Sequence, residues 1–327
     1  MPTRRQVLAH LLAAPAVVVV GRRAGAQAAR RTLHLVVGFP AGGGTDVIAR
    51  ILADRLRVSF ASSVIVENKP GAAARVSVDY VKNAEPDGSV VLFTPDFPIT
   101  LYPHSFRSLS YDPLRDLTPV APAARSMLTY IVGPAVPASV KSLADFVQWC
   151  KAHPESATYA TTAAGGTPHF VGVMLASAAG IAMTPVHYRG GAPALQDLIG
   201  GHVPAGVNPI SETLSLARSG TVRILAVSGA RRSPFLPDVP TMREQGYDVV
   251  AEAWLGAFVP AATPGATVRT LGAAINDAAR APDMAESLAK FGNEPVFQTP
   301  EEFAATVRAD IARWGPVVKA SGFVAED

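Results

Sequence analysis

Apolar runs and helix-periodic segments alternate through the first third of the chain. The first run is continuous apart from His34, is rich in β-branched residues and ends at Pro40, which three glycines follow closely. The pattern predicts strands at 33–39, 64–66 and 90–94, with helices from about 46 and at 76–83. Strand, helix, strand, helix, strand in this order indicates a parallel sheet with helices on its faces.

A second set of the same kind begins near residue 129. It predicts strands at 129–132, 158–161, 185–188 and 224–228, and helices at 143–151, 170–178 and 192–199. A strand at 254–259 follows a proline-rich connection, and helices dominate from 268 onward. Prolines cluster at 119–122 and 234–240, which we interpret as crossings between two lobes. The expected division is lobe 1 at 27–126 and 251–327, and lobe 2 at 127–250.

The N-terminus has the pattern of an export signal. Arg4 and Arg5 precede an apolar stretch at 7–20, and a small-x-small cleavage site ends at Ala26. We expect a signal peptide at 1–26 and a soluble periplasmic protein after cleavage, the alternative being an uncleaved anchor. The twin arginine leaves the choice between the Sec and Tat routes open.

Composition narrows the class of protein. Of the 327 residues, 49% are hydrophobic and 17% are charged, which allows a sizeable core and argues against disorder. The net charge of +3 depends on four arginines among the first 26 residues, since the rest holds 25 basic and 26 acidic side chains. No basic stripe remains, so we expect no nucleic-acid partner. The single cysteine, Cys150, excludes an intramolecular disulfide, and we expect it to be buried on a helix.

The first candidate site is the loop at 39–46 (FPAGGGTD), between a predicted strand and a helix. Its glycines let backbone N–H groups converge, and the helix start adds unpaired N–H groups and the positive end of the macrodipole. Such a place suits a carboxylate or phosphate, with Thr45 or Asp46 as the helix cap. A P-loop is excluded because no Gly-Lys-Ser/Thr follows, and Val47 replaces the third glycine of a dinucleotide fingerprint. A plain tight turn is the alternative.

The second candidate site is the loop at 161–169 (TTAAGGTPH). Thr167 followed by Pro168 is typical of an N-cap and a first helical residue. Two glycine loops that lead into helices, one in each lobe, indicate a small anionic ligand clamped between them.

Other polar residues have two interpretations each. Arg189 follows a strand and supplies either a counter-charge or a salt bridge between lobes. His169 either donates a hydrogen bond to the ligand or is structural. Thr94 and Asp96 end a strand and point either into the cleft or into a local turn, and Asn208 either borders the site or shapes its loop.

Motifs of catalysis are missing from the sequence. It contains no His-Glu-x-x-His, no Gly-x-Ser-x-Gly and no clustered metal-ligand set, so we expect no catalytic residue, metal or cofactor. An exported hydrolase or lyase that uses His169 and Asp46 is the remaining enzymatic alternative, and it lacks a nucleophile–base arrangement.

Through a set of motifs in the same order, the sequence resembles the Bug-type substrate-binding receptors of tripartite tricarboxylate transporters. These motifs are VGFPAGGGTDVIAR at 37–50, VENKPGA at 66–72, PDG at 86–88, YDP at 111–113, HYRGGAPAL at 187–195, LPDVPT at 236–241 and TPEEF at 299–303. The sequence differs from the family where alanines follow Gly71 in place of further glycines. It also differs at 200–204 (GGHVP), which has His202 and, after Val203, Pro204 in place of the usual acid.

The resemblance implies an α/β, two-lobed periplasmic-binding-protein-like (type II) fold. Each lobe is then a mainly parallel sheet flanked by helices, and the cleft between the lobes closes on a small carboxylate. The implied ligand is a di- or tricarboxylate, an acidic amino acid or an aromatic acid. The implied partner is a membrane transporter that receives this ligand from a monomeric receptor, the alternative being a membrane sensor kinase. The implied ligand-binding residues are Phe39, Ala41, Gly42, Gly43, Thr45, Asp46, Thr161, Thr162, Ala163, Gly165, Gly166, Thr167 and His169, with Asp96 and Asn208 selecting the rest of the ligand.

Overall fold

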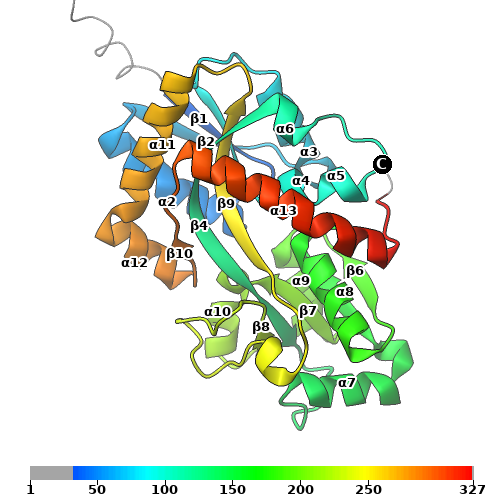
Figure 1. The fold of residues 1–327 in the computed structure, drawn as a ribbon. Coiled ribbons are helices and arrows are strands. Elements are labelled where there is room, and N and C mark those ends of the chain that lie inside the picture. The colour runs from blue at the N-terminus through cyan, green and yellow to red at the C-terminus, as the bar shows by residue number, and fades with distance from the viewer. Residues whose placement is uncertain (1–31, 326–327) are drawn as a thin grey trace, which may run out of the picture.

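The computed structural model describes residues 32–325 of the chain (Figure 1). The expected signal peptide at 1–26 lies outside the described residues. Among the helices at 32–325, none is both long enough and apolar enough to cross a membrane.

The first third forms the predicted parallel sheet. Its elements are β1 (Thr32–Val37), α2 (Gly44–Ser59), β2 (Ser63–Asn68), η1 (Ala72–Ala74), α3 (Arg75–Lys82) and β3 (Val90–Pro95). Three short helices follow: α4 (Phe97–Thr100), α5 (Tyr102–Ser105) and α6 (Pro113–Asp116). β1 pairs in parallel with β2 and with β3, so its carboxyl end and the glycine loop after it lie at one edge of the sheet.

Two strands connect the halves of the molecule. β4 (Leu117–Val132) pairs antiparallel with β9 (Glu252–Pro260) over residues 117–127, and from Leu128 it pairs with β7 and β8 instead. We call the part that contains β1, β2, β3, β9 and β10 the first half-sheet, and the part that contains β5 to β8 the second. β4 belongs to both and runs from one to the other (Figure 1).

The structure corrects the expected crossing at 119–122. This segment lies inside β4, where the register against β9 shifts at Pro119 and again at Pro122. Proline has no backbone N–H to donate to a ladder and is therefore found at such irregularities. The segment at 234–240 is no crossing either. The end of this segment pairs with β8. The backbone N–H of Val227 in β8 donates to the Pro240 carbonyl, and the N–H of Met242 donates to the Val227 carbonyl.

The second half-sheet contains a strand and an α-helix that the sequence pattern did not predict. Its strands are β5 (Thr158–Thr161), β6 (Thr184–His187), β7 (Ala205–Pro209) and β8 (Arg223–Val227). Its helices are α7 (Leu143–Ala152), η2 (Pro154–Ser156), α8 (Thr167–Ala179), α9 (Gly191–Ile199), α10 (Ile210–Arg218) and η3 (Arg243–Gln245). β5 pairs in parallel with β6 and β7. The strand β7 and the helix α10 were missed because AGVNP, the sequence of β7, reads as a turn.

The C-terminal helices close the molecule, as predicted. They are α11 (Gly265–Arg280), α12 (Pro282–Lys290) and α13 (Pro300–Ser321), with the short β10 (Glu294–Pro295) between the last two. A capping box of Thr299 and Glu302 starts α13, which lies across β4 (Figure 1). Its buried Trp314 packs near Phe170 of α8, at 6.4 Å between ring centroids, so α13 touches both halves.

Tight packing of α8 against β5 generates one stability prediction. A Cβ added at Gly172 would lie 2.1 Å from the Tyr159 ring, which is itself fully buried. We therefore expect Gly172→Ala to lower the free energy of unfolding by about 1–3 kcal/mol, although alanine favours helix by about 1 kcal/mol. Urea unfolding followed by circular dichroism measures this change.

The matched control is Gly265→Ala in the first turn of α11. Its added Cβ would meet only the end of the flexible Arg269 side chain, at 3.4 Å. We expect it to leave stability unchanged or to raise it slightly. Equal effects of the two substitutions would contradict the packing argument.

Candidate functional site

The first glycine loop is held by Asp46 from inside its own helix. α2 begins at Gly44, and its N-cap residue Gly43 supplies no side chain, so neither Thr45 nor Asp46 takes the cap position that we expected. Instead the Asp46 carboxylate accepts the backbone N–H of Gly42 at 2.8 Å and a bidentate pair of bonds from Arg50. Burial alone would raise the pKa of Asp46, but the hydrogen bonds outweigh it and lower that pKa.

Asp46 also ties this loop to β2. The Asn68 side chain donates to the Asp46 carboxylate at 2.9 Å and to the Phe39 carbonyl at 3.0 Å. Gly42 has φ +83°, a left-handed conformation that glycine adopts at no steric cost. Asp46 therefore preorganises the loop and does not face the cleft.

The second glycine loop is built in a different way. α8 begins at Thr167 and its N-cap residue is Gly166, which corrects the expected cap by one residue. The Thr167 hydroxyl donates to Asp96 Oδ2 at 2.8 Å, across the gap between the two halves. The backbone N–H of Gly165 donates to His169 Nδ1 at 3.2 Å. Burial, with a smaller contribution from His187, lowers the pKa of His169 to about 3, so this ring is neutral and free to accept that bond.

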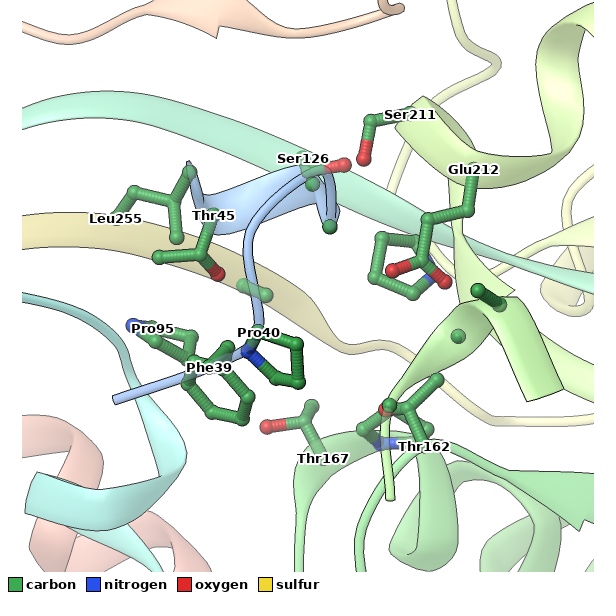
Figure 2. Close-up of a pocket in the computed structure, with 18 of the residues that line it drawn as sticks. Phe39, Pro40, Thr45, Pro95, Ser126, Thr162, Thr167, Ser211, Glu212 and Leu255 are labelled. Atoms are coloured by element: carbon green, nitrogen blue, oxygen red, sulfur yellow. The ribbon is translucent and has the colours of Figure 1, made fainter. Parts of the chain in front are cut away.

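A cavity of about 250 Å³ lies between these two loops. It is lined from the first half by the loop at 39–45, by 95–97 and by β4 and β9, and from the second half by Thr162, Thr167, 189–193 and the start of α10. Figure 2 shows Ser211 and Glu212 projecting into the space that Pro40 and Phe39 reach from the other side. Backbone N–H groups, hydroxyls and a few charges therefore converge on a small, partly apolar space, as in many ligand sites.

The structure brings about half of the candidate residues to this cavity. Those that line it are Phe39, Ala41, Gly42, Gly43, Thr45, Asp96, Thr162, Thr167 and Arg189. Those that do not line it are Asp46, Thr94, Thr161, Ala163, Gly165, Gly166, His169 and Asn208. Ala163 lines a second cavity of about 990 Å³, which shares Phe39, Thr162 and Arg189 with the first.

Glu212 is the main residue that the sequence analysis missed. It lies in the first turn of α10 and accepts hydrogen bonds from Asn208 Nδ2, at 3.0 Å, and from the backbone N–H of Gly44 in the first loop. Burial raises the pKa of Glu212 despite these bonds. Gly191 packs closely against this carboxylate, because an added Cβ would lie 1.9 Å from Glu212 Oε2 and would displace the end of that side chain. The sequence shows only a glutamate four residues after Asn208. This spacing predicts a contact between the two side chains only if a helix begins between them, and no helix was predicted there.

The charges of the cavity are unusual for a site that receives an anion. Asp96 is 1% exposed, and its Oδ1 has no hydrogen-bond partner among the described residues. Burial raises the pKa of Asp96 to about 7, with the Thr167 hydroxyl opposing it in part. Arg189 is exposed and makes no ion pair with another residue of 32–325, so the salt bridge between lobes, one of its two interpretations, is not formed.

The sequence differences from the Bug-type pattern lie outside the 250 Å³ cavity. Three successive alanines, Ala72, Ala73 and Ala74, have φ of 44°, 53° and 73°, and they border the second cavity. His202 is exposed and faces Asp197 at 3.4 Å. Among the described residues, neither His202 nor Pro204 lines the 250 Å³ cavity. No group of three or more metal-ligating side chains comes together within 32–325.

Comparison with known proteins places this geometry in a family. The family described as "Tripartite tricarboxylate transporter family receptor" matches residues 48–323. Protein BugT of Bordetella pertussis (strain Tohama I / ATCC BAA-589 / NCTC 13251) is 32% identical over 294 residues, which cover 89% of this chain and 90% of BugT.

Two solved structures are similar over nearly their whole length. An R. palustris protein solved with adipate is 30% identical, has a TM-score of 0.85 and is matched over 90% of this chain and 98% of its own. The periplasmic binding protein BugD is 29% identical, has a TM-score of 0.84 and is matched over 90% and 99%. These similarities confirm the expected two-lobed α/β fold. The chain belongs to the receptor family of the tripartite tricarboxylate transporters and is a Bug-type solute-binding protein.

Proposed function

We propose that this protein is a periplasmic receptor that captures a small carboxylate in its cleft and delivers it to a tripartite membrane transporter. The observation that carries the proposal is the cavity between two glycine loops, each at the start of a helix and each from a different half of the molecule. Unpaired N–H groups and the macrodipole make both helix starts suitable for an anion.

The side chains around the cavity support carboxylate binding. The hydroxyls of Thr45 and Thr162 and the guanidinium of Arg189 line it and can donate to carboxylate oxygens. The R. palustris relative was solved with the carboxylate adipate. In this proposal the first 26 residues export the chain and are then removed.

The proposed mechanism is closure of two lobes around the ligand. We assign 27–126 and 251–327 to lobe 1 and 127–250 to lobe 2, in agreement with the change of β4 partners at Leu128. Open and closed forms exchange, and a ligand that touches both lobes favours the closed form. The bond from Thr167 to Asp96 spans the lobes and is a contact of the closed form.

The enzymatic alternative requires Asp46 and His169 to act on a ligand. Both side chains instead hold their own loops, which agrees with binding without a catalytic step. The Asp46 carboxylate is fully engaged by Gly42, Arg50 and Asn68. His169 is 2% exposed and accepts a bond from its own loop. Neither side chain is free to act as a base on a ligand.

A thermal-shift panel tests the proposed function directly. Residues 27–327 are unfolded, refolded to remove any carried ligand, and melted with mono-, di- and tricarboxylates, amino acids and aromatic acids. A ligand at 100 times its Kd adds about 2.7 kcal/mol of stability, which gives a clear shift in Tm. We expect shifts confined to a few related acids, and a flat response across the panel would contradict carboxylate binding.

The contact between the lobes gives a second prediction, Thr167→Val. The substitution keeps the shape of the side chain but leaves Asp96 without its hydroxyl donor, so we expect a loss of about 1–3 kcal/mol in unfolding free energy. Thr263→Val is the matched control, since its buried hydroxyl has no partner among the described residues and its loss should cost nothing. Equal losses in both variants would show that the bond to Asp96 does not stabilise the protein.

Titration of Asp96 gives a third prediction. Its pKa is about 7 in the folded protein and about 3.9 in an unfolded chain, so the folded state holds the proton more tightly. The stability from this group is complete below about pH 4 and is lost as the pH rises to about 7. Relative to wild type, ligand-free Asp96→Asn should gain stability over this range, by about 4 kcal/mol at most.

Urea unfolding of both proteins at several pH values measures this difference. Other titrating groups, including His169 and Glu212, are common to both proteins and largely cancel. A difference that stays constant with pH would contradict the raised pKa of Asp96.

A further inference from the structure

Two carboxyl groups from opposite halves of the molecule line the same cavity. Asp96 follows β3 in the first half and Glu212 begins α10 in the second. Arg189 is the one cationic side chain among the described lining residues, and it is exposed. A cavity built only to receive anionic groups would not place two acids in its wall, because like charges in a poorly hydrated space repel.

Asp96 offers an unused acceptor. Its Oδ2 accepts from Thr167, but Oδ1 is buried and has no partner among the described residues. A buried polar atom without a partner costs free energy, so an atom that remains so at the wall of a ligand cavity points to a donor on the ligand.

Glu212 is held in place and reduces what the first loop can offer an anion. Asn208 fixes its Oε2, and the backbone N–H of Gly44 also donates to its carboxylate. That N–H is one of the donors at the start of α2, so the glutamate already occupies part of the anion site. A ligand carboxylate must use the remaining donors near Thr45, Thr162 and Arg189.

We propose that the ligand is a carboxylate that also carries a protonated nitrogen, an amino acid or a similar zwitterion without a second carboxylate. Asp96 accepts from its ammonium group through the unpartnered Oδ1, Glu212 adds a second acid to the lining of the cavity, and the donors near Thr45, Thr162 and Arg189 bind its carboxylate. This inference rests on the proposed receptor function. An ammonium group has three donors and no acceptor, which suits the unpartnered Asp96 Oδ1 in a cavity that a second acid also lines. The same two acids exclude dicarboxylates by repulsion.

Chain-matched ligands test the proposal by isothermal titration calorimetry on refolded residues 27–327. One series is γ-aminobutyrate, butyrate and glutarate, a second is δ-aminovalerate, valerate and adipate, and a third is alanine, propionate and methylmalonate. Within each series only the second group changes, from ammonium to hydrogen to carboxylate. We expect the amine of at least one series to bind at least about tenfold tighter than both of its counterparts.

Charge-neutral variants identify the residues that act on the ligand. Glu212→Gln and Asp96→Asn should each weaken binding of the amine by about tenfold or more, while affinity for the dicarboxylate of the same series stays equal or rises. The matched control is Asp277→Asn, which removes one charge from an exposed position on α11 and should leave every affinity unchanged.

The outcomes separate this inference from the proposed function. If carboxylates bind but no amine binds at least about tenfold tighter than both of its counterparts, the inference is overturned and the receptor function stands. Failure of every carboxylate, including those of the broader thermal-shift panel, overturns both. Equal loss of amine and dicarboxylate binding in the variants shows that the acids are structural and also overturns it. If neither variant folds, the order of the wild-type affinities still decides.

Discussion

The antiparallel pairing of β4 with β9 is the contact on which the rest of the structure depends. β4 is long enough to pair with β9 in one half and with β7 and β8 in the other, so a single strand sets how the two half-sheets face each other. The glycine loops follow β1 and β5, one in each half. Their meeting at one cavity is therefore a consequence of strand pairing far from either loop.

Each loop depends on a different buried polar residue. Asp46 gathers Gly42, Arg50 and Asn68 and gives the first loop a fixed shape before any ligand arrives. In the second loop His169, kept neutral by burial, accepts the N–H of Gly165. In both cases a side chain that does not line the cavity fixes the conformation of its loop, which reduces the ordering cost of binding.

The family and the cavity charges give different information. Membership in the receptor family accounts for the two-lobed fold, which this chain shares with BugD. Asp96 and Glu212 are particular side chains set into that frame, and they alter what the frame can bind. The physical reason is that backbone donors recognise a carboxylate in general, whereas wall charges determine what else the ligand carries.

The sequence by itself determined the order of strands and helices, both glycine loops and the family resemblance, because these depend on periodicity and on residues close together in the chain. It failed at β7 and α10, where glycine, asparagine and proline suggested a turn, and at Pro119 and Pro122, which interrupt the pairing of a strand without ending it. Only the tertiary structure decided which residues share the cavity. Asp96 and Glu212 are more than a hundred positions apart. No local pattern shows that strand pairing brings both to one cavity, or that burial leaves one Asp96 oxygen without a partner among the described residues.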